Sequence, residues 1–212
     1  KARFFQRAQS VAGCRLILWG LFKKVVVADS LAPFVDNAFT QSESAGSLQL
    51  IAGMLAFTFQ IYGDFSGYSD IALGTAKLFG FELLSNFRFP YFSRDLAEFW
   101  RRWHISLSSW FRDYLYIPLG GSQGGKVTAI RNTFVIFLVS GFWHGASWNF
   151  IVWGLIHACG FLPLLLAGQN RRHAGTDVAV GRILPNWLEW RGMLTTFVFV
   201  CFAWVFFRAE SL

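Results

Sequence analysis

The feature that most constrains the fold of this chain is a long run without a charged side chain. No Asp, Glu, Lys or Arg occurs between Arg131 and Arg171, and a short polar interruption, residues 143–149, falls near the middle of this apolar run. About 20 apolar residues cross the roughly 30 Å hydrocarbon core of a bilayer as a helix. The run therefore predicts nearly two membrane spans joined at that interruption.

The composition agrees with a membrane protein. The chain is 54% hydrophobic, 19% aromatic and 15% charged, with a mean hydropathy of +0.41, whereas soluble domains carry about 25% charged residues. Its net charge of +7 comes from Lys and Arg that flank apolar runs. This placement is typical of membrane-flanking residues and argues against a nucleic-acid partner. The three cysteines lack CxxC spacing, which argues against a disulfide framework or a cysteine metal site.

The first third of the chain predicts a helix followed by a loop. Residues 11–31 are apolar but are interrupted by basic side chains, including Lys23 and Lys24. We therefore expect a helix that lies at the interface or packs against other helices, and that ends at Pro33. Residues 29–47 contain acidic side chains but no Lys or Arg. They predict a loop that faces away from the cytoplasm.

A further span is predicted over residues 44–63, which carry no charge. The next residues contain Gly, Ser and two aspartates, Asp64 and Asp70, so an irregular segment is expected before the helical pattern resumes over residues 71–84. Asp64 and Asp70 have two open interpretations. They either cap helices just outside the membrane or line a polar vestibule.

His104 is the first ionisable residue in unusual surroundings. Asp95 and Glu98 predict the capped start of a helix that would carry it and stop near Pro118. At 100° per residue, His104 falls on the same aromatic face as Trp100, while arginines fall opposite. Such a helix is expected to be interfacial or re-entrant. The glycine-rich residues 120–126 that follow lack the complete GxxxxGK[ST] arrangement of a phosphate loop, and no buried parallel strand precedes them, so they predict a plain loop.

His144 lies inside the charge-free run, and an ionisable side chain there is a functional-site hypothesis by default. Its neighbours Gly141 and Gly145 would let a substrate or a neighbouring helix approach closely. His157 would not face the same site on a continuous helix, so we expect a structural histidine that hydrogen-bonds a neighbouring helix. Residues 171–190 are predicted to form a loop or the start of an interfacial helix, and residues 192–207 a last apolar run.

Four motifs together resemble the membrane-bound O-acyltransferase family, most closely its bacterial alginate O-acetylation branch, with the teichoic acid D-alanylation branch as a relative. They are YGDFSGYSD (62–70), FWRRWHISL (99–107), WFRDYLYIPLGG (110–121) and GFWHGA (141–146). The resemblance implies an all-α, polytopic membrane fold with a tunnel and with interfacial or re-entrant helices. We take residues 1–212 as one membrane-embedded acyltransferase core, a piece of a longer chain.

The resemblance also implies roles and partners. The family's essential histidine matches His144, and a second polar position matches His104. The candidate tunnel residues are Trp103, Trp143, Trp148, Asp64 and Asp70. An acyl thioester, acetyl-CoA or an acyl carrier, would donate from the cytoplasmic side of the bacterial inner membrane, with no tightly bound cofactor and no metal. The acyl group, acetyl by this resemblance, would pass towards an extracytoplasmic polysaccharide such as alginate, with an extracytoplasmic acyltransferase as partner.

The chemistry can be stated from the residues alone. Attack of a hydroxyl on an acyl thioester needs a base for the hydroxyl proton, which a neutral imidazole can be. His144 is the better candidate base and His104 a positioning residue. One alternative is a transporter or channel with a His/Asp relay. Another is a non-catalytic scaffold, and a two-histidine metal site lacks a third ligand at a recognisable spacing.

Overall fold

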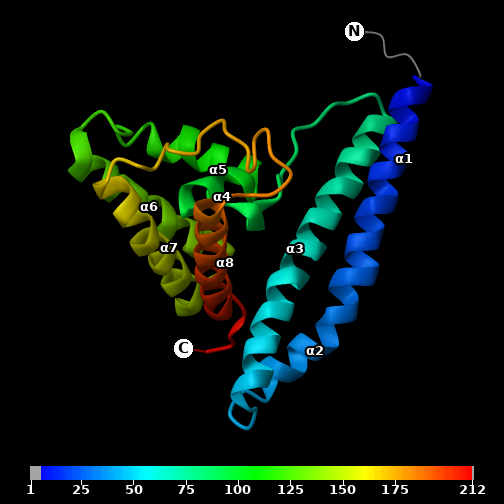
Figure 1. Cartoon of the computed structure of the whole chain (residues 1–212), viewed down its shortest axis with the longest axis horizontal. Helices are drawn as coiled ribbons and strands as arrows, with labels where there is room; N and C mark the ends of the chain where they lie inside the picture. Colours follow the sequence, from blue (N-terminus) through cyan, green and yellow to red (C-terminus); the bar gives the residue numbers. More distant parts are fainter. Residues whose placement is uncertain (1–5, 212) are drawn as a thin grey trace. The chain divides into compact units, whose positions relative to one another are not determined.

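The computed structural model describes residues 6–211, and every regular element within them is helical. The chain divides after Asn86 into two compact units, a first and a second unit that are described separately below (Figure 1). The all-α architecture expected from the sequence is confirmed. We predicted a single core over residues 1–212. Residues 1–5 and 212 of that range lie outside the described residues.

The first unit is a long helical hairpin. One arm consists of α1 (Arg7–Leu21), the π-helical η1 (Phe22–Ala28) and α2 (Asp29–Thr40), which follow one another without a break; the other arm is α3 (Ser47–Leu78) (Figure 1). The arms approach closely where glycines meet. A Cβ added to Gly20 would lie 2.6 Å from the carbonyl oxygen of Gly67. Small residues thus let the two backbones pack closely, as membrane helices commonly do.

The predicted loop over residues 29–47 is wrong in its first part. α2 is helical through Thr40, and only the short turn after it connects the two arms. Pro33 lies inside α2 and does not end the helix. It stands close to the start of α2, directly after the π-helical turns of η1, and a proline costs least near a helix start, where backbone N–H groups lack intrahelical partners.

The predicted irregular segment around residues 60–70 is also wrong. α3 runs through it without interruption, because Gly63 and Gly67 are buried against the other arm, where a larger side chain would clash. Small residues in this position serve helix packing and do not break the helix. α3 ends at Leu78, earlier than the predicted end of the apolar pattern at residue 84.

The second unit is built from short helices packed on three long ones (Figure 1). Its elements are η2 (Pro90–Phe92), α4 (Leu96–Arg102), α5 (Ile105–Phe111), η3 (Arg112–Tyr116), α6 (Gly125–His144), α7 (Trp148–Leu166) and α8 (Trp187–Arg208). The charge-free run forms parts of two helices, α6 and α7, joined by residues 145–147. The predicted span is borne out by length and composition for α7 but not for α6. Within residues 6–211, α7 and α8 are the two helices long and apolar enough to cross a membrane by length and composition.

The start of α4 confirms the predicted cap, since the Glu98 backbone N–H donates to the Asp95 carboxylate at 2.7 Å. The predicted continuation to His104 is wrong. α4 ends at Arg102, and His104 has a φ of 44°, in the left-handed region, before α5 begins. The single aromatic face expected for one continuous helix therefore does not form.

An ion network holds these short helices in place. The Glu98 side chain is only 2% exposed and accepts hydrogen bonds from Arg94 and Arg102. Arg94 also reaches Glu189 at the start of α8 and donates to the Thr176 carbonyl in the loop before it. Burial would raise the pKa of Glu98, but the hydrogen bonds from Arg94 and the charge of Arg102 hold it below its ordinary value. The network thus ties α4, α8 and this loop together.

Candidate active site

His144 is the last residue of α6 and is half-buried among aromatic rings. Its ring centroid lies 4.9 Å from that of Trp143, 5.2 Å from Trp153 and 5.0 Å from Phe207. These rings come from α6, α7 and α8, so the second unit surrounds the imidazole from three helices. Such a pocket fixes the ring and limits its contact with water, as a catalytic base requires.

Gly141 explains how α6 brings His144 to this place. A Cβ on Gly141 would collide with the backbone carbonyl of Phe150 on α7, and one on Gly145 would collide with the Phe150 ring. The two glycines therefore permit the close approach of a neighbouring helix, which is one of the two possibilities expected for them. The end of α6 therefore packs directly against the start of α7.

His104 lies at the sharp break between α4 and α5. Histidine visits the left-handed region more often than most residues other than glycine, yet such a backbone costs energy and commonly marks functional sites. The ring is half-buried, and this burial lowers the pKa of His104 from 6.5 to about 4. The imidazole is therefore neutral at physiological pH, with one nitrogen able to accept and one able to donate.

The structure brings the two predicted histidines together. Trp143 contacts both rings, at 6.5 Å between centroids for His104 and 4.9 Å for His144. One side chain comes from the α4–α5 break and the other from the end of α6. Each therefore depends on a helix end for its position.

The structure contradicts the expected hydrogen bond from His157 to a neighbouring helix. The His157 side chain is completely buried between Phe99 and Phe137, and neither ring nitrogen has a hydrogen-bond partner within residues 6–211. It packs instead against Trp153, which also contacts His144. His157 thus belongs to the aromatic support of the site.

The three tryptophans predicted to line a tunnel differ in their surroundings. Trp103 is 4% exposed and packs in the core against Phe99 and Trp204. Trp143 and Trp148 are 57% and 75% exposed at the end of α6 and the start of α7. Of the three, Trp143 is the one placed beside both histidines. A role in a tunnel stays a prediction for all three.

Asp64 and Asp70 lie within α3 of the first unit, so the capping interpretation is wrong. Asp70 pairs with Lys23 at 2.8 Å, and Lys24 pairs with both Asp64 and Asp29, at 2.7 and 2.8 Å. The pairs of Lys23 with Asp70 and of Lys24 with Asp64 join the two arms of the hairpin, while the pair of Lys24 with Asp29 lies within one arm. All three compensate charges on otherwise apolar helices. The vestibule interpretation stays a prediction.

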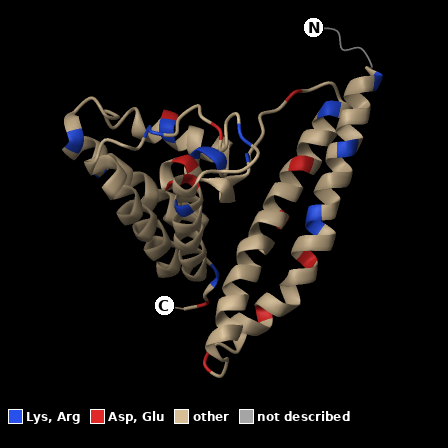
Figure 2. Cartoon of the chain, viewed as in Figure 1, with Lys and Arg blue, Asp and Glu red and all other residues tan. Residues whose placement is uncertain are grey.

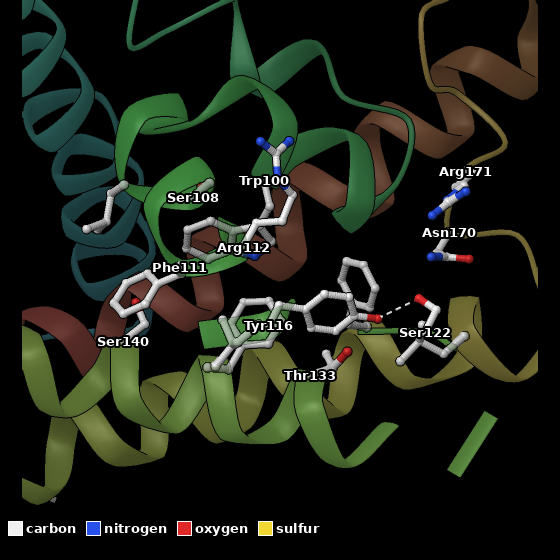
Figure 3. Close-up of a pocket in the computed structure, with 15 residues that line it drawn as sticks. Trp100, Ser108, Phe111, Arg112, Tyr116, Ser122, Thr133, Ser140, Asn170 and Arg171 are labelled. Carbon is white, nitrogen blue, oxygen red and sulfur yellow. Dashed lines mark hydrogen bonds between the residues drawn. The ribbon is translucent and has the colours of Figure 1, made fainter. Parts of the chain in front are cut away.

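Two cavities in the second unit were not predicted from the sequence. The first, of about 250 Å³, lies between α5, η3 and α6, and Figure 3 shows its lining residues. Thr133, Phe137 and Ser140 line it at helical spacing, and the next position of this stripe is His144. The stripe was visible in the sequence, but its partners on α5 and η3 were not. The second cavity, of about 470 Å³, has four arginines among its lining residues, Arg88, Arg101, Arg102 and Arg112.

Within the described residues, no group of three or more His, Cys, Asp or Glu side chains could hold a metal ion.

Sequence comparisons place this arrangement among known proteins. Residues 2–206 match the membrane-bound O-acyltransferase family. The chain is 46% identical over 201 residues to a probable alginate O-acetylase of Azotobacter vinelandii, covering 94% of this chain and 38% of the relative. It is 43% identical to a peptidoglycan O-acetyltransferase of Helicobacter pylori, covering 91% and 35%, respectively. A teichoic acid D-alanyltransferase of Streptococcus thermophilus is 32% identical, covering 91% and 50%. The chain thus spans between about a third and a half of these relatives.

Proposed function

We infer a function from the premise that this chain belongs to the membrane-bound O-acyltransferase family. The chain is part of a membrane enzyme that transfers an acyl group to a hydroxyl group. Acetyl is the first candidate for this acyl group. The observation that carries the proposal is the meeting of His104 and His144 at Trp143. Two half-buried imidazoles in an aromatic pocket supply a base and a hydrogen-bonding partner where water is scarce.

In the proposed reaction, His144 accepts the proton of the acceptor hydroxyl as its oxygen attacks the thioester carbonyl carbon. The C–O bond forms, the tetrahedral intermediate collapses, and the C–S bond breaks. The thiolate then takes the proton from His144, so that ester and thiol leave and the imidazole is neutral again. General-base catalysis of this kind contributes typically 10²- to 10⁴-fold in rate.

His104 is proposed as the positioning partner. Because its pKa lies at about 4, it stays neutral at physiological pH and can donate a hydrogen bond to the acceptor or to the developing oxyanion. Its left-handed backbone, fixed between α4 and α5, would hold the imidazole in one orientation.

The chemistry of acyl transfer supports the choice of donor, and the activities of the relatives support the choice of acceptor. We propose that the donor is a thioester, acetyl-CoA or an acyl carrier, on the cytoplasmic side of a bacterial inner membrane. The proposed acceptor is a polysaccharide on the other side of this membrane. An extracytoplasmic acyltransferase would be the partner that helps the acyl group to reach it. Alginate is the first candidate acceptor, because a relative of 46% identity is a probable alginate O-acetylase. Peptidoglycan is the second, because a relative of 43% identity is a peptidoglycan O-acetyltransferase.

The experiment that tests this proposal is reconstitution of the full-length protein with its partners in liposomes. Acetyl-CoA, or acetylated carrier protein, is supplied outside, without an ion gradient, and ester formation on alginate or peptidoglycan fragments is measured. The enzyme should release thiol and form ester in equal amounts. Movement of solute or ions with the thioester left intact would instead establish the transporter alternative.

A further inference from the structure

A third cavity in the second unit, of about 540 Å³, lies beside the start of α8. Its lining comes from the first turns of α8, from the loop that precedes this helix and from the residue before the cap of α4. The ionisable side chains among the lining residues are Arg94, Arg172, His173, Glu189 and Arg191. The volume falls within the usual range of small-molecule sites, about 300 to 1,000 Å³. We call it the α8 cavity.

The one carboxylate of the α8 cavity does not neutralise its arginines. Glu189 already accepts hydrogen bonds from Arg94, from a backbone N–H group and from Arg182, which lies outside the cavity lining. Within residues 6–211, Arg172 and Arg191 have no carboxylate within 4 Å of a guanidinium nitrogen. Two guanidinium groups at the wall of the cavity are thus left without an anionic partner.

The surroundings of His173 reflect the positive charge of this cavity. Burial lowers the pKa of His173, and the charges of Arg94 and Arg172 lower it further, against the opposing effect of Asp95 and Glu98. The imidazole is therefore neutral at physiological pH and can donate one hydrogen bond. Guanidinium groups bind phosphate oxygens through paired hydrogen bonds, so phosphate is the anion that suits the α8 cavity best.

An apolar stripe on α8 begins at this cavity. Leu194, Val198 and Phe202 follow Arg191 at helical spacing and are 62%, 56% and 51% exposed. From Arg191 to Phe202 the stripe extends over about 16 Å at 1.5 Å per residue, which is about half of the roughly 30 Å hydrocarbon core of a bilayer. A ligand with a phosphate head and an apolar chain that reaches the middle of a bilayer would match the cavity and the stripe.

The start of α8 is also expected to lie at the level of the lipid headgroups. Trp187 and Trp190 are 76% and 49% exposed there, and tryptophans are enriched at membrane–water interfaces. Arg191 follows Trp187 by one helical turn. Figure 2 shows few charged residues along α7 and α8 and several Lys and Arg in the segments that join the elements of this unit. The loop between α7 and α8 carries three arginines, and basic residues next to membrane spans favour the cytoplasmic side.

We infer that the α8 cavity binds the phosphate of an anionic phospholipid from the cytoplasmic leaflet, and that an acyl chain of this lipid lies along the apolar stripe of α8. Arg172 and Arg191 hold the phosphate from the loop and from the helix, so the lipid joins these two segments. The positive lining favours an anionic headgroup, such as phosphatidylglycerol, over zwitterionic phosphatidylcholine. Binding of this lipid does not depend on the acyl transfer proposed for His144.

The test uses purified full-length protein in detergent, with phosphatidylglycerol and phosphatidylcholine of identical acyl chains as probes. Native mass spectrometry measures how much of each lipid stays bound as its concentration is raised. Phosphatidylglycerol should bind more tightly than phosphatidylcholine. Arg172→Gln and Arg191→Gln should each weaken phosphatidylglycerol binding about 10- to 100-fold, the loss of a charge-assisted hydrogen bond. Arg15→Gln, which changes an exposed arginine of the first unit, is the matched control and should bind normally.

Two further variants separate the contributions of the cavity and the stripe. Arg191→Lys keeps the charge but not the planar fork and should bind with intermediate affinity. Leu194→Ser shortens the apolar stripe and should weaken the binding of both lipids, while the preference for phosphatidylglycerol remains. A melting temperature close to that of the wild type, measured without added lipid, shows that each variant is folded.

Four outcomes would overturn the inference. Normal phosphatidylglycerol binding by Arg172→Gln and Arg191→Gln would show that the lipid binds elsewhere. Equal affinity of the wild type for the two lipids would show that the charge of the headgroup is not recognised. Binding of glycerol 3-phosphate as tight as that of phosphatidylglycerol would assign the cavity to a water-soluble phosphate compound. Displacement of phosphatidylglycerol by coenzyme A would assign it to the acyl donor.

Discussion

His104 and His144 both lie against the ring of Trp143 in the second unit, with centroid distances of 6.5 and 4.9 Å, although one follows α4 and the other ends α6. The pair therefore exists only when the α4–α5 break and the α6–α7 hairpin are both formed. Any change that moves either helix end should separate the two histidines without touching them.

The first prediction distinguishes the contribution of the His104 side chain to activity from that of its backbone conformation. Asn and Gly both tolerate the left-handed conformation, whereas Ala does not. If hydrogen bonding by His104 positions the substrate, His104→Asn should retain more transfer activity than His104→Gly or His104→Ala. The measurement is the rate of ester formation by full-length protein, normalised to folded protein. Equal activity of the Asn and Gly variants, both above Ala, would assign the effect to the backbone alone.

The second prediction concerns pH and stability. The pKa of His104 is about 4 in the fold, below its ordinary value of 6.5, so between these values the unfolded chain takes up a proton that the folded chain does not. The contribution of His104 to the free energy of unfolding is therefore complete above pH 6.5 and declines as the pH falls towards 4. The melting temperature of the wild type should fall more between pH 7 and pH 5 than the melting temperature of His104→Asn. Identical losses would contradict the assigned burial.

Much of the second unit could be predicted from hydrophobic pattern alone. The charge-free run gives most of α6 and all of α7 with their break near His144, because each apolar stretch is long enough for a helix and a polar interruption separates the two. The cap of α4 followed from Asp95 and Glu98, whose side chains act locally. Patterns that depend on one element were therefore sufficient for these parts.

The errors come from residues whose role is set by a partner segment. Gly63 and Gly67 resemble helix breakers in the sequence, but they are helical because the other arm packs on them. Asp70 resembles a cap until Lys23 is placed beside it. For the candidate site, both histidines could be selected from their apolar surroundings, but the helix break at His104 and the arginine-lined cavity depend on tertiary contacts.

The third prediction concerns the ion network around α4. Glu98→Gln leaves Arg94 and Arg102 without their shared buried carboxylate, and breaking a buried ion pair costs about 3 to 5 kcal/mol. The variant should unfold at clearly lower temperature or denaturant concentration in detergent. Glu82→Gln, whose carboxylate is 77% exposed beside Lys77, is the matched control and should change stability by about 0.5 kcal/mol or less. Equal stability of the two variants would contradict the network.

The fourth prediction concerns topology. Ser42 lies in the exposed turn between α2 and α3, beside acidic residues, and should face away from the cytoplasm. Gln123 lies in the exposed turn before α6, close to Lys126, and should face the cytoplasm. Single cysteines at these positions, in a chain without its natural cysteines, should react with an impermeant thiol reagent from opposite sides. Labelling of both positions from one side would disprove this assignment.

The measurement that tests the account most directly is acyl transfer by His144→Gln. Glutamine fills a similar space and can form hydrogen bonds, but it cannot accept a proton at neutral pH. The full-length variant, inserted and folded normally and assayed with its partners and a purified polysaccharide acceptor, should lose 10²-fold or more of the wild-type rate. A near-normal rate of ester formation would remove His144 from the mechanism and contradict the central claim.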